Sequence, residues 1–357
     1  MSGEEQRVTL KMIAEKAGIS IGTVDRAIHH RGGVSENSRQ LVMRIAKELG
    51  YRPNKFARAL GRKSAIHIGI VCPEEPREFY CDVNTGIDNA IEELRDYSAT
   101  FEKLTYKTQD PQQVFECLAG IDPARFDGLA INSAGPSVVS QINAFVQAGV
   151  SVITFNTDAT ESNRLFYVGN DSRQSGLMGG ELLSMLMKGG GNVTVLGNFA
   201  RIAPFIDRFG GFCEYVQSNM TNINVIPCSE CHSVPELAAQ ILMDLLRRQS
   251  DIAGIFCTGY SSTVGAATAL KKMGRKDIHM VGYDVTERTA QMMHEGWCDA
   301  LLYQAPYHQG YQAVTLLVRH ILEGWEPPQK RLIIDTQIAI RSNVRGYIEK
   351  TPITPYI

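Results

Sequence analysis

The sequence has 357 residues, with 36 Lys and Arg against 38 Asp and Glu, and 44% of its residues are hydrophobic. This length allows more than one domain, and the composition is that of a globular chain rather than a disordered one. The sequence has no run of 18 apolar residues and no early apolar segment. We therefore expect neither a membrane span nor a signal peptide, and a protein that stays in the cytoplasm.

The charge is unevenly distributed along the chain. Residues 1–63 contain 13 Lys and Arg against 6 Asp and Glu, which leaves 23 against 32 for the remainder. A small basic segment joined to a larger acidic one indicates a polyanion-binding module attached to a body that binds something else.

Three short helices are predicted between residues 9 and 49. Thr9 is a good N-cap for a helix that runs to Gly18, where the chain must turn. Ser20 begins a second helix and Ser35 a third. Two short helices joined by a Gly-containing turn are typical of a DNA-binding helix-turn-helix. The second helix has an exposed face made of Ile21, Gly22, Asp25, Arg26 and His29.

A shorter segment follows Pro53. Asn54 can cap one and a half further turns, over residues 55–61. An isolated helix of this length is marginal in water. We expect the segment to order only against a partner.

The run TLKMIAEKAGISIGTVDRAIHHRGGVSENSRQLVMRIAKELGYRPNKFARAL resembles the N-terminal headpiece of the lac repressor (LacI/GalR) family over nearly all its length. The matching positions are Ala14, Ala17, Gly18, Ser20, Thr23, Val24, Arg26, Val34, Ser35, Arg39, Leu49, Gly50, Tyr51, Pro53, Asn54, Ala57 and Leu60. The resemblance implies a sequence-specific transcriptional regulator, with a repressor as the expected type, that binds a pseudopalindromic operator in double-stranded DNA as a homodimer.

The same resemblance assigns roles to individual residues of the head. It places Ile21, Gly22 and Arg26 against base edges, and arginine is well shaped for guanine. It assigns phosphate contacts to Thr9, Ser20, Thr23, Ser35 and Asn54. Residues 54–60, with Ala57 and Leu60, look like the family's hinge helix, which pairs with its copy in the minor groove and inserts the leucine as a wedge.

Asp25 departs from the family, which usually has a small hydroxyl residue there. A carboxylate is unfavourable near phosphates, so Asp25 either accepts a hydrogen bond from a cytosine amino group or holds Arg26 in its working rotamer. The operator sequence therefore cannot be taken from relatives.

From residue 66 onward, predicted strands and helices alternate. Apolar β-rich runs at 66–71, 128–132, 151–156, 192–196, 225–228, 254–257 and 279–283 each precede a helical pattern. Regular alternation of this kind predicts parallel sheets covered by helices, and the length predicts two such sheets that meet at a cleft.

Polar and aromatic residues follow these strands. Ligands of open α/β sheets bind at the carboxyl ends of strands. Asparagine, aspartate, glutamine and arginine side chains with aromatic faces suit a polyhydroxylated ligand, because each hydroxyl group both donates and accepts. The strand-end candidates are Arg77, Phe79, Tyr80, Asn132, Asn156, Asp158, Arg208, Tyr260, Asp284 and Gln304.

The body, from residue 66 to about 348, resembles the type I periplasmic-binding fold, closest to its ribose-binding-like members. The motifs that carry this resemblance are Phe79-Tyr80 with Gly86, Asp127-Gly128, Asn156, Val168-Gly169-Asn170-Asp171, Gly176, Arg208-Phe209-Gly210-Gly211-Phe212, Val281-Gly282-Tyr283-Asp284, Gln304-Ala305-Pro306 and Gln309-Gly310. The resemblance places Arg77, Phe79, Tyr80, Asn156, Arg208, Asp284 and Gln304 at a sugar site, with His232 near an aromatic position that covers the ligand.

One departure leaves the ligand open. Residues 257–260 stand where relatives usually have an Asn-Asp pair. Arg77 and Arg208 together could instead favour an acidic or phosphorylated sugar, and a cyclitol or nucleoside also stays open.

Other classes of function are less well supported. The sequence has no Gly-rich phosphate loop, no G-x-S-x-G motif and no His pair at metal-ligand spacing. A sugar-binding receptor would share the body but would need export. We therefore expect no catalytic residue, no enzyme activity and no contact with a membrane.

The eight cysteines include Cys228 and Cys231 in a C-x-x-C-H pattern, which is used for haem attachment in exported proteins. Without an export signal or further ligands, we expect reduced thiols, no cofactor and no metal.

The predicted domains are 1–52 (helix-turn-helix), 53–63 (hinge and linker), 64–350 (two-lobed effector-binding and dimerisation domain) and 351–357 (tail). Because the tail contains two prolines, it should not form a tetramerising helix.

Overall fold

The computed structural model describes residues 10–28, 33–49, 65–108, 110–188, 190–197, 202–219, 222–226 and 230–349. The chain divides into two compact units, residues 1–63 and residues 64–357. In the described part of the chain, none of the helices is long and apolar enough to cross a lipid bilayer.

The first unit is a three-helix head, which consists of α1 (Leu10–Ala17), α2 (Ile21–Ile28) and α3 (Glu36–Glu48). Gly18 adopts a φ of 65° between α1 and α2, as a turn at this point requires. Ser20 and Ser35 accept hydrogen bonds from the backbone N–H groups of Thr23 (3.1 Å) and Ser38 (3.3 Å), so both serines cap helices as predicted. The core of the head is Ile13, Ala14, Val24, Ala27, Val42, Ile45 and Ala46.

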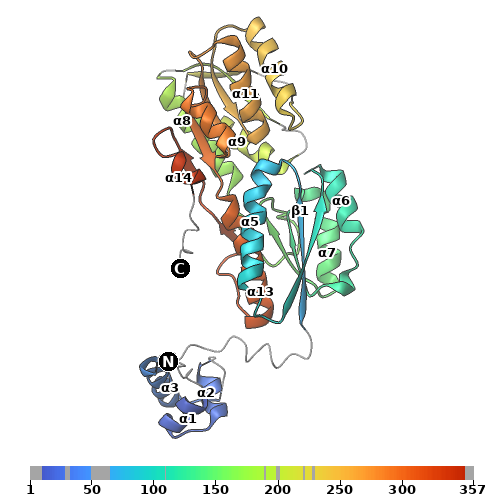
Figure 1. Ribbon diagram of the computed structural model, residues 1–357, viewed down its shortest axis with the longest axis vertical. Coiled ribbons are helices and arrows are strands. Elements are labelled where there is room, and N and C mark those ends of the chain that lie inside the picture. The colour runs from blue at the N-terminus through green and yellow to red at the C-terminus, as the bar shows by residue number, and fades with distance from the viewer. Residues whose placement is uncertain are drawn as a thin grey trace, which may run out of the picture. The chain divides into compact units, whose positions relative to one another are not determined.

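The second unit contains two lobes, each built on a six-stranded sheet (Figure 1). The first lobe has the parallel strand order β11-β5-β4-β3-β1-β2. Its strands are β1 (Ile66–Pro73), β2 (Ala99–Tyr106), β3 (Gly128–Ile131), β4 (Ser151–Phe155), β5 (Tyr167–Gly169) and β11 (Arg331–Ile333). One face packs against α5 (Arg77–Glu93) and α13 (Pro306–Glu323), and the other against α6 (Pro111–Ala119) and α7 (Val139–Gln147). The 3-10 turns η1 (Pro123–Arg125) and η2 (Gly135–Val138) flank β3.

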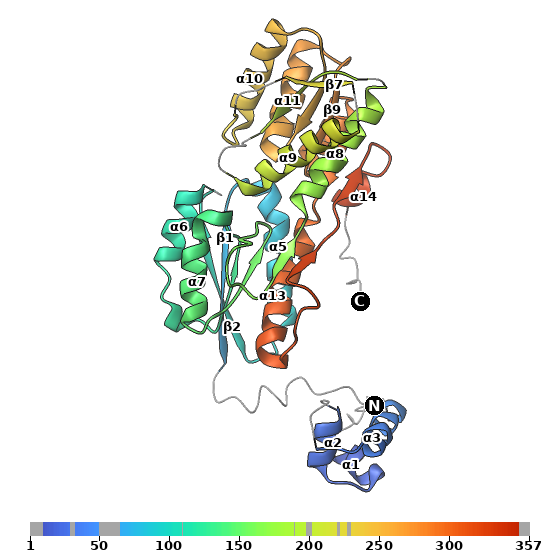
Figure 2. The same ribbon diagram turned by 180° about the vertical axis from the view of Figure 1, so that it is seen from behind.

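The second lobe is the upper one in Figure 2, where β7 and β9 are labelled. Its strand order is β12-β10-β9-β8-β6-β7, in which β12 alone runs antiparallel to its neighbour. Its strands are β6 (Gly191–Leu196), β7 (Ile223–Ile226), β8 (Ile252–Cys257), β9 (His279–Tyr283), β10 (Ala300–Tyr303) and β12 (Gln337–Ala339). Helices α8 (Ser172–Leu186) and α9 (Ala203–Ser218) cover one face. The other face carries α10 (Pro235–Arg248), α11 (Tyr260–Met273) and α12 (Glu287–His294), with the short α14 (Arg345–Ile348) at the end of the described chain.

This architecture confirms the predicted fold class, a helical head and a two-lobed α/β body with mainly parallel sheets. The patterns did not predict β2, because it is an edge strand with mixed polar and apolar residues, or the helix α6 that follows it. The apolar stripe of Val83, Ile87, Ile91 and Leu94 predicts the first helix of the body over residues 83–94, but α5 begins at Arg77. Phe79 and Tyr80 in its first turn are buried and lie three to four positions before Val83, so they extend the apolar stripe of this helix.

Close helix contacts depend on glycine at both lobes. A Cβ on Gly86 of α5 would lie 2.0 Å from the carbonyl oxygen of Tyr307 in α13. A Cβ on Gly176 of α8 would lie 2.2 Å from the carbonyl oxygen of Arg208 in α9. Both helix pairs therefore approach closer than any side chain would allow, and the second contact fixes the backbone of a predicted ligand residue.

Candidate ligand cavity and nucleic-acid interface

The second unit contains a cavity of about 700 Å³ between residues that follow strands of both sheets. Its size lies within the range of small-molecule sites. Nine of the ten residues predicted for the ligand site line it: Arg77, Phe79, Tyr80, Asn156, Arg208, His232, Tyr260, Asp284 and Gln304. The tenth, Asn132, is fully buried behind the wall.

Arg208 organises the wall that the second lobe contributes. The guanidinium group donates from Nη1 to the carbonyl oxygen of Thr258 (2.7 Å) and from Nη2 to Oε1 of Gln304 (2.5 Å). The amide of Gln304 in turn donates to Oδ1 of Asp284 (2.6 Å). The guanidinium carbon of Arg208 lies 4.2 Å from the ring centroid of Tyr283, beneath the cavity. Hydrogen bonds and ring contact together hold this cation in one orientation.

Three polar atoms in this wall lack a hydrogen-bond partner within the described chain. They are Nε of Arg208, Oγ1 of Thr258 and the hydroxyl oxygen of Tyr260, and all three atoms are buried. Buried polar groups are nearly always hydrogen-bonded. A donor and two hydroxyl groups left unsatisfied at a cavity wall are what a hydroxylated ligand or bound water would satisfy.

Asp284 lies at the end of β9 with 6% of its surface exposed. Burial raises its pKa to about 6, although Arg208 and the amide of Gln304 lower it. The carboxylate is therefore mainly ionised at neutral pH but protonated in mild acid.

The backbone is left-handed at three positions that follow strands by one or two residues. Asn156 has a φ of 60°, Asp284 a φ of 67° and Ala305 a φ of 51°. Asn and Asp adopt this region more readily than other non-glycine residues, whereas alanine is strained there. Such positions are enriched at ligand sites.

The first lobe contributes a wall of hydrogen-bonded side chains. The hydroxyl of Tyr80 donates to Oδ1 of Asn156 (3.3 Å), and the amide of Asn132 lies 3.3 Å from the same oxygen. Burial raises the pKa of Tyr80 far above its usual value, so the phenol stays protonated. Asn132 therefore supports Asn156 and Tyr80 from behind rather than lining the cavity.

The rim of the cavity is more polar and more exposed. Arg77 is exposed in the first turn of α5, and His232 is exposed with a φ of 47°. Burial and the nearby carboxylate of Glu78 raise the pKa of Tyr260 to about 12.

Sequence reasoning missed several lining residues. The most prominent is Phe205, whose ring centroid lies 5.5 Å from the guanidinium carbon of Arg208. It precedes Arg208 by three positions on α9, so helical spacing could have identified it. Thr258, which directly follows β8, and Arg288, on α12, also line the cavity.

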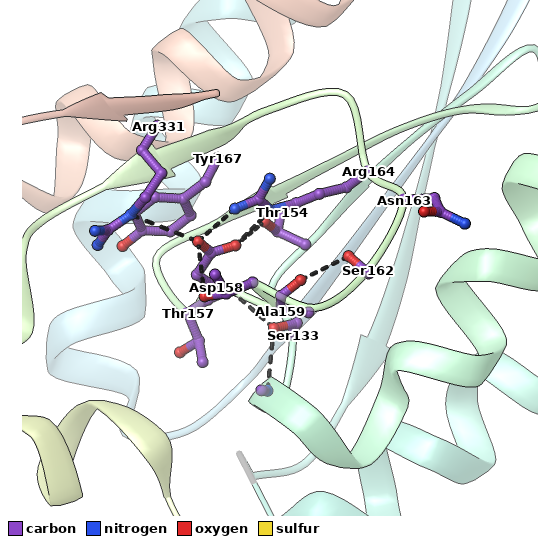
Figure 3. A network of polar contacts seen from close by, with 12 residues as sticks. Ser133, Thr154, Thr157, Asp158, Ala159, Ser162, Asn163, Arg164, Tyr167 and Arg331 are labelled. Carbon is purple, nitrogen blue, oxygen red and sulfur yellow. Dashed lines mark hydrogen bonds and ion pairs between the residues drawn. The ribbon is translucent and has the colours of Figure 1, made fainter. Parts of the chain in front are cut away.

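Asp158 also follows β4 but does not line the cavity. Its carboxylate accepts two hydrogen bonds from the buried guanidinium group of Arg164 (2.5 and 2.6 Å) and lies 3.7 Å from Arg331, as Figure 3 shows. Arg331 extends over the ring of Tyr167. Asp158 therefore has a structural role beside the cavity.

In the head, the predicted base-contacting residues of α2 are exposed together. The side chain of Ile21 is 49% exposed, and Gly22 and Arg26 are exposed on the same helix. Arg26 donates from Nε to the carbonyl oxygen of Gly22 (3.1 Å), which leaves its terminal nitrogens available on this face. Asp25 is partly buried. An isoleucine and an arginine that are both exposed on this helix suit contact with base edges.

Other predicted DNA contacts are used locally or lie outside the described residues. Ser20 and Thr23 share a hydrogen bond between their hydroxyl groups (2.9 Å), and Ser35 caps α3. The predictions for Thr9, His29, Asn54, Ala57 and Leu60 fall on residues that the structure does not describe.

The C-x-x-C-H segment is only partly described. Cys231 is buried, and its thiol donates to the carbonyl oxygen of Gly197 (3.4 Å). Within the described residues, no group of three or more His, Cys, Asp or Glu side chains is arranged to hold a metal ion.

Comparison with known families identifies both units. The family "Bacterial regulatory proteins, lacI family" matches residues 9–54, and "Periplasmic binding protein domain" matches residues 68–324. The ribose operon repressor of Halalkalibacterium halodurans is 22% identical over 341 residues, which cover 95% of this chain and 97% of that repressor.

Solved structures share the fold of the body. GanP, a glucose-galactose binding protein from Geobacillus stearothermophilus, has a TM-score of 0.73 and 23% identity and covers 79% of this chain and 99% of its own. A putative LacI transcriptional regulator from Bacteroides fragilis has a TM-score of 0.71 and 18% identity, over 80% of this chain and all of its own. At these identities the likeness shows the fold alone.

Proposed function

Since the chain belongs to the lacI family of bacterial regulatory proteins, with a periplasmic-binding-type body, we propose that a neutral polyhydroxylated ligand, most simply a sugar, binds between its lobes and controls its affinity for operator DNA. The chain is a DNA-binding regulator of transcription, and repression is the expected mode. The relatives named above, a ribose operon repressor and a glucose-galactose binding protein, agree with a sugar effector.

The main observation in favour of a neutral ligand is that the inner wall of the cavity contains one buried positive and one buried negative side chain. Arg208 and Asp284 are both buried and are joined through the amide of Gln304. A hydroxyl group can donate to the carboxylate and accept from the free N–H of Arg208 at once. A phosphate or carboxylate would have to lie beside ionised Asp284, which is unfavourable.

The charges at the rim of the cavity also favour a neutral ligand, because acidic side chains outnumber basic ones. The lining includes the carboxylates of Glu75, Glu78, Asp110 and Glu236, against the guanidinium groups of Arg77 and Arg288. An acidic or phosphorylated sugar, which the two arginines Arg77 and Arg208 favoured from the sequence, is therefore the second candidate.

Two copies would act together on DNA. A homodimer would place two α2 helices in the major-groove half-sites of a pseudopalindrome. Residues 53–63 would form the paired hinge at its centre, with Leu60 as the wedge. A ligand that prefers one angle between the lobes would change the spacing of the two hinges and so the affinity for the operator. We place this action in the cytoplasm, without a metal or cofactor.

Thermal unfolding of the full-length protein tests the ligand class. The panel contains D-ribose, D-glucose, D-galactose, myo-inositol, sugar acids, sugar phosphates and nucleosides. A ligand at about 100 times its dissociation constant should add roughly 2.7 kcal/mol to the free energy of unfolding. Stabilisation by a neutral member is the expected result, and stabilisation by anions alone would contradict the proposal.

A pair of aspartate variants locates the site. Asp284→Asn should lose the stabilisation by ligand, whereas Asp277→Asn, at an exposed position, should keep it. Loss in both variants, or in neither, would argue against this cavity.

The DNA half of the proposal is tested without ligand. Selection from random duplexes should return a pseudopalindrome, and sedimentation of the complex should show two copies per duplex. Leu60→Ala should weaken binding and reduce bending of the selected duplex. Unchanged affinity and bend angle would refute the hinge assignment.

A further inference from the structure

The chain passes between the two lobes at three places. It crosses between β5 and α8 at residues 170–171, between β10 and α13 at residues 304–305, and between β11 and β12 at residues 334–336. Any change in the angle between the lobes must be accommodated at these crossings.

A chain of four side-chain amides leads from the cavity wall to the crossings. Asn132 donates to Oδ1 of Asn156 (3.3 Å), and Asn156 donates to Oε1 of Gln309 (3.0 Å). Gln309 donates to Oδ1 of Asn170 (2.6 Å), and Asn170 donates to the carbonyl oxygen of Ile334 (2.6 Å). Because a backbone carbonyl can only accept, the last link fixes the direction of every amide before it.

Gln309 joins all three crossings. Its Nε2 atom also donates to the carbonyl oxygen of Gln304 (2.8 Å) in the second crossing. Asn170 lies in the first crossing and reaches Ile334 in the third. Gln309 is fully buried and Asn170 is 5% exposed, so water cannot readily replace these bonds.

A phenol strengthens the same junction. The hydroxyl of Tyr167 lies 3.0 Å from the backbone carbonyl oxygens of both Asn156 and Asn170. Arg331, at the start of β11, lies over the ring of Tyr167, as Figure 3 shows. Arg331 also lies 3.7 Å from Asp171, the N-cap of α8. Cavity wall and crossings are thus parts of one polar assembly.

We propose that Gln309 and Asn170 are positioning residues that transmit occupancy of the cavity to the three crossings. This inference rests on the proposed function, because it assumes that a ligand bonds to Asn156. A ligand hydroxyl on the amide of Asn156 alters the first link, and the directed chain carries the change to Asn170 and Ile334. Neither Gln309 nor Asn170 lines the cavity, so neither is needed to hold the ligand.

Hydrogen–deuterium exchange at the backbone N–H of Ile334 reports on the junction, since this group donates to the carbonyl oxygen of Gly169 (2.8 Å) and joins the first and third crossings. In the ligand-free protein, Gln309→Met should speed this exchange about tenfold, as expected for the loss of one net hydrogen bond. Asn170→Asp should do the same, because aspartate still accepts from Gln309 but cannot donate to Ile334. Gln312→Met is the matched control, a partly exposed glutamine on the same helix, and should leave the exchange unchanged.

Transmission is tested from the cavity end, again without ligand. Asn156→Gly removes the first donor to Gln309, and glycine adopts the φ of 60° at this position without strain. If the amides act as a chain, exchange at Ile334 should rise in this variant too. An effect of Gln309→Met equal to that of Gln312→Met, or no effect of Asn156→Gly, would overturn the proposal.

Measurements with added sugars distinguish a failure of this proposal from a failure of the proposed function. With D-ribose, D-glucose or D-galactose, a sugar that raises the melting temperature of the wild type should also slow exchange at Ile334. In Gln309→Met the same sugar should still raise the melting temperature but should no longer change the exchange rate at Ile334. A purely structural role of Gln309 would not separate these two effects of the sugar. If none of these sugars stabilises the wild type, the sugar assignment fails, whereas the ligand-free variants still decide the role of the amide chain.

Discussion

Replacing Asp284 with asparagine should make the protein more stable at neutral pH while it weakens effector binding. The carboxyl group has a pKa of about 6 in the folded protein and an ordinary value of 3.8, because burial disfavours its ionised form. At about 1.4 kcal/mol for each pKa unit, ionised Asp284 costs roughly 3 kcal/mol at pH 7.5. Asparagine resembles the protonated acid in shape and avoids this cost.

The cost depends on pH with a definite sign. Above pH 6 both folded and unfolded states are ionised, and the full cost is present. As the pH falls from 6 to 3.8 the folded state binds the proton first, so this residue's cost shrinks, to about 1.5 kcal/mol at pH 5. The advantage of Asp284→Asn over the wild type should therefore fall by about 1.5 kcal/mol between pH 7.5 and pH 5.

Urea unfolding at these two pH values measures the effect. Trp297 packs against the core of the second lobe and Trp325 against that of the first, so fluorescence reports on both lobes. The control is Asp277→Asn, since a hydrogen bond from Arg275 lowers the pKa of Asp277 and its loss should be slightly destabilising at neutral pH. An Asp284→Asn variant less stable than the wild type at pH 7.5, or a difference that does not change with pH, would refute the reasoning.

Three further predictions concern ligand affinity, DNA binding and packing. Effector affinity should be constant above about pH 6 and should fall by up to roughly tenfold per pH unit below it, because ligand hydroxyl groups bond to ionised Asp284. Calorimetry across pH 5–8 measures the affinity, and a flat profile would show that the ligand does not bond to this carboxylate. Arg26→Met should weaken operator binding, measured by fluorescence anisotropy, by about 1–3 kcal/mol, whereas the control Arg44→Met on α3 should not. Equal effects of the two substitutions would argue against α2 as the recognition helix. Gly176→Ala should both lower the melting temperature and weaken effector binding, because the added Cβ would lie 2.2 Å from the carbonyl oxygen of Arg208. A wild-type melting temperature together with wild-type effector affinity would show that α8 and α9 can move apart without loss of stability.

The amino-acid sequence by itself determined the organisation of this protein. Helix caps such as Ser20 and Ser35, the glycine at residue 18 and the excess of basic residues predicted the head, because capping and turn formation are local interactions. Alternating strands and helices predicted parallel sheets, whose strand ends necessarily share an edge. For this reason eight of the ten strand-end candidates line the cavity, and His232, which the resemblance placed there, is the ninth lining residue found without coordinates.

Tertiary structure alone decided what those residues do. No sequence pattern showed that Asn132 lies behind the wall or that Asp158 pairs with Arg164. The chain of amides through Gln309 and Asn170 joins segments more than 100 positions apart. Burial, which sets the pKa of Asp284 and the value of each buried hydrogen bond, depends on how the lobes pack and therefore cannot be read from local sequence.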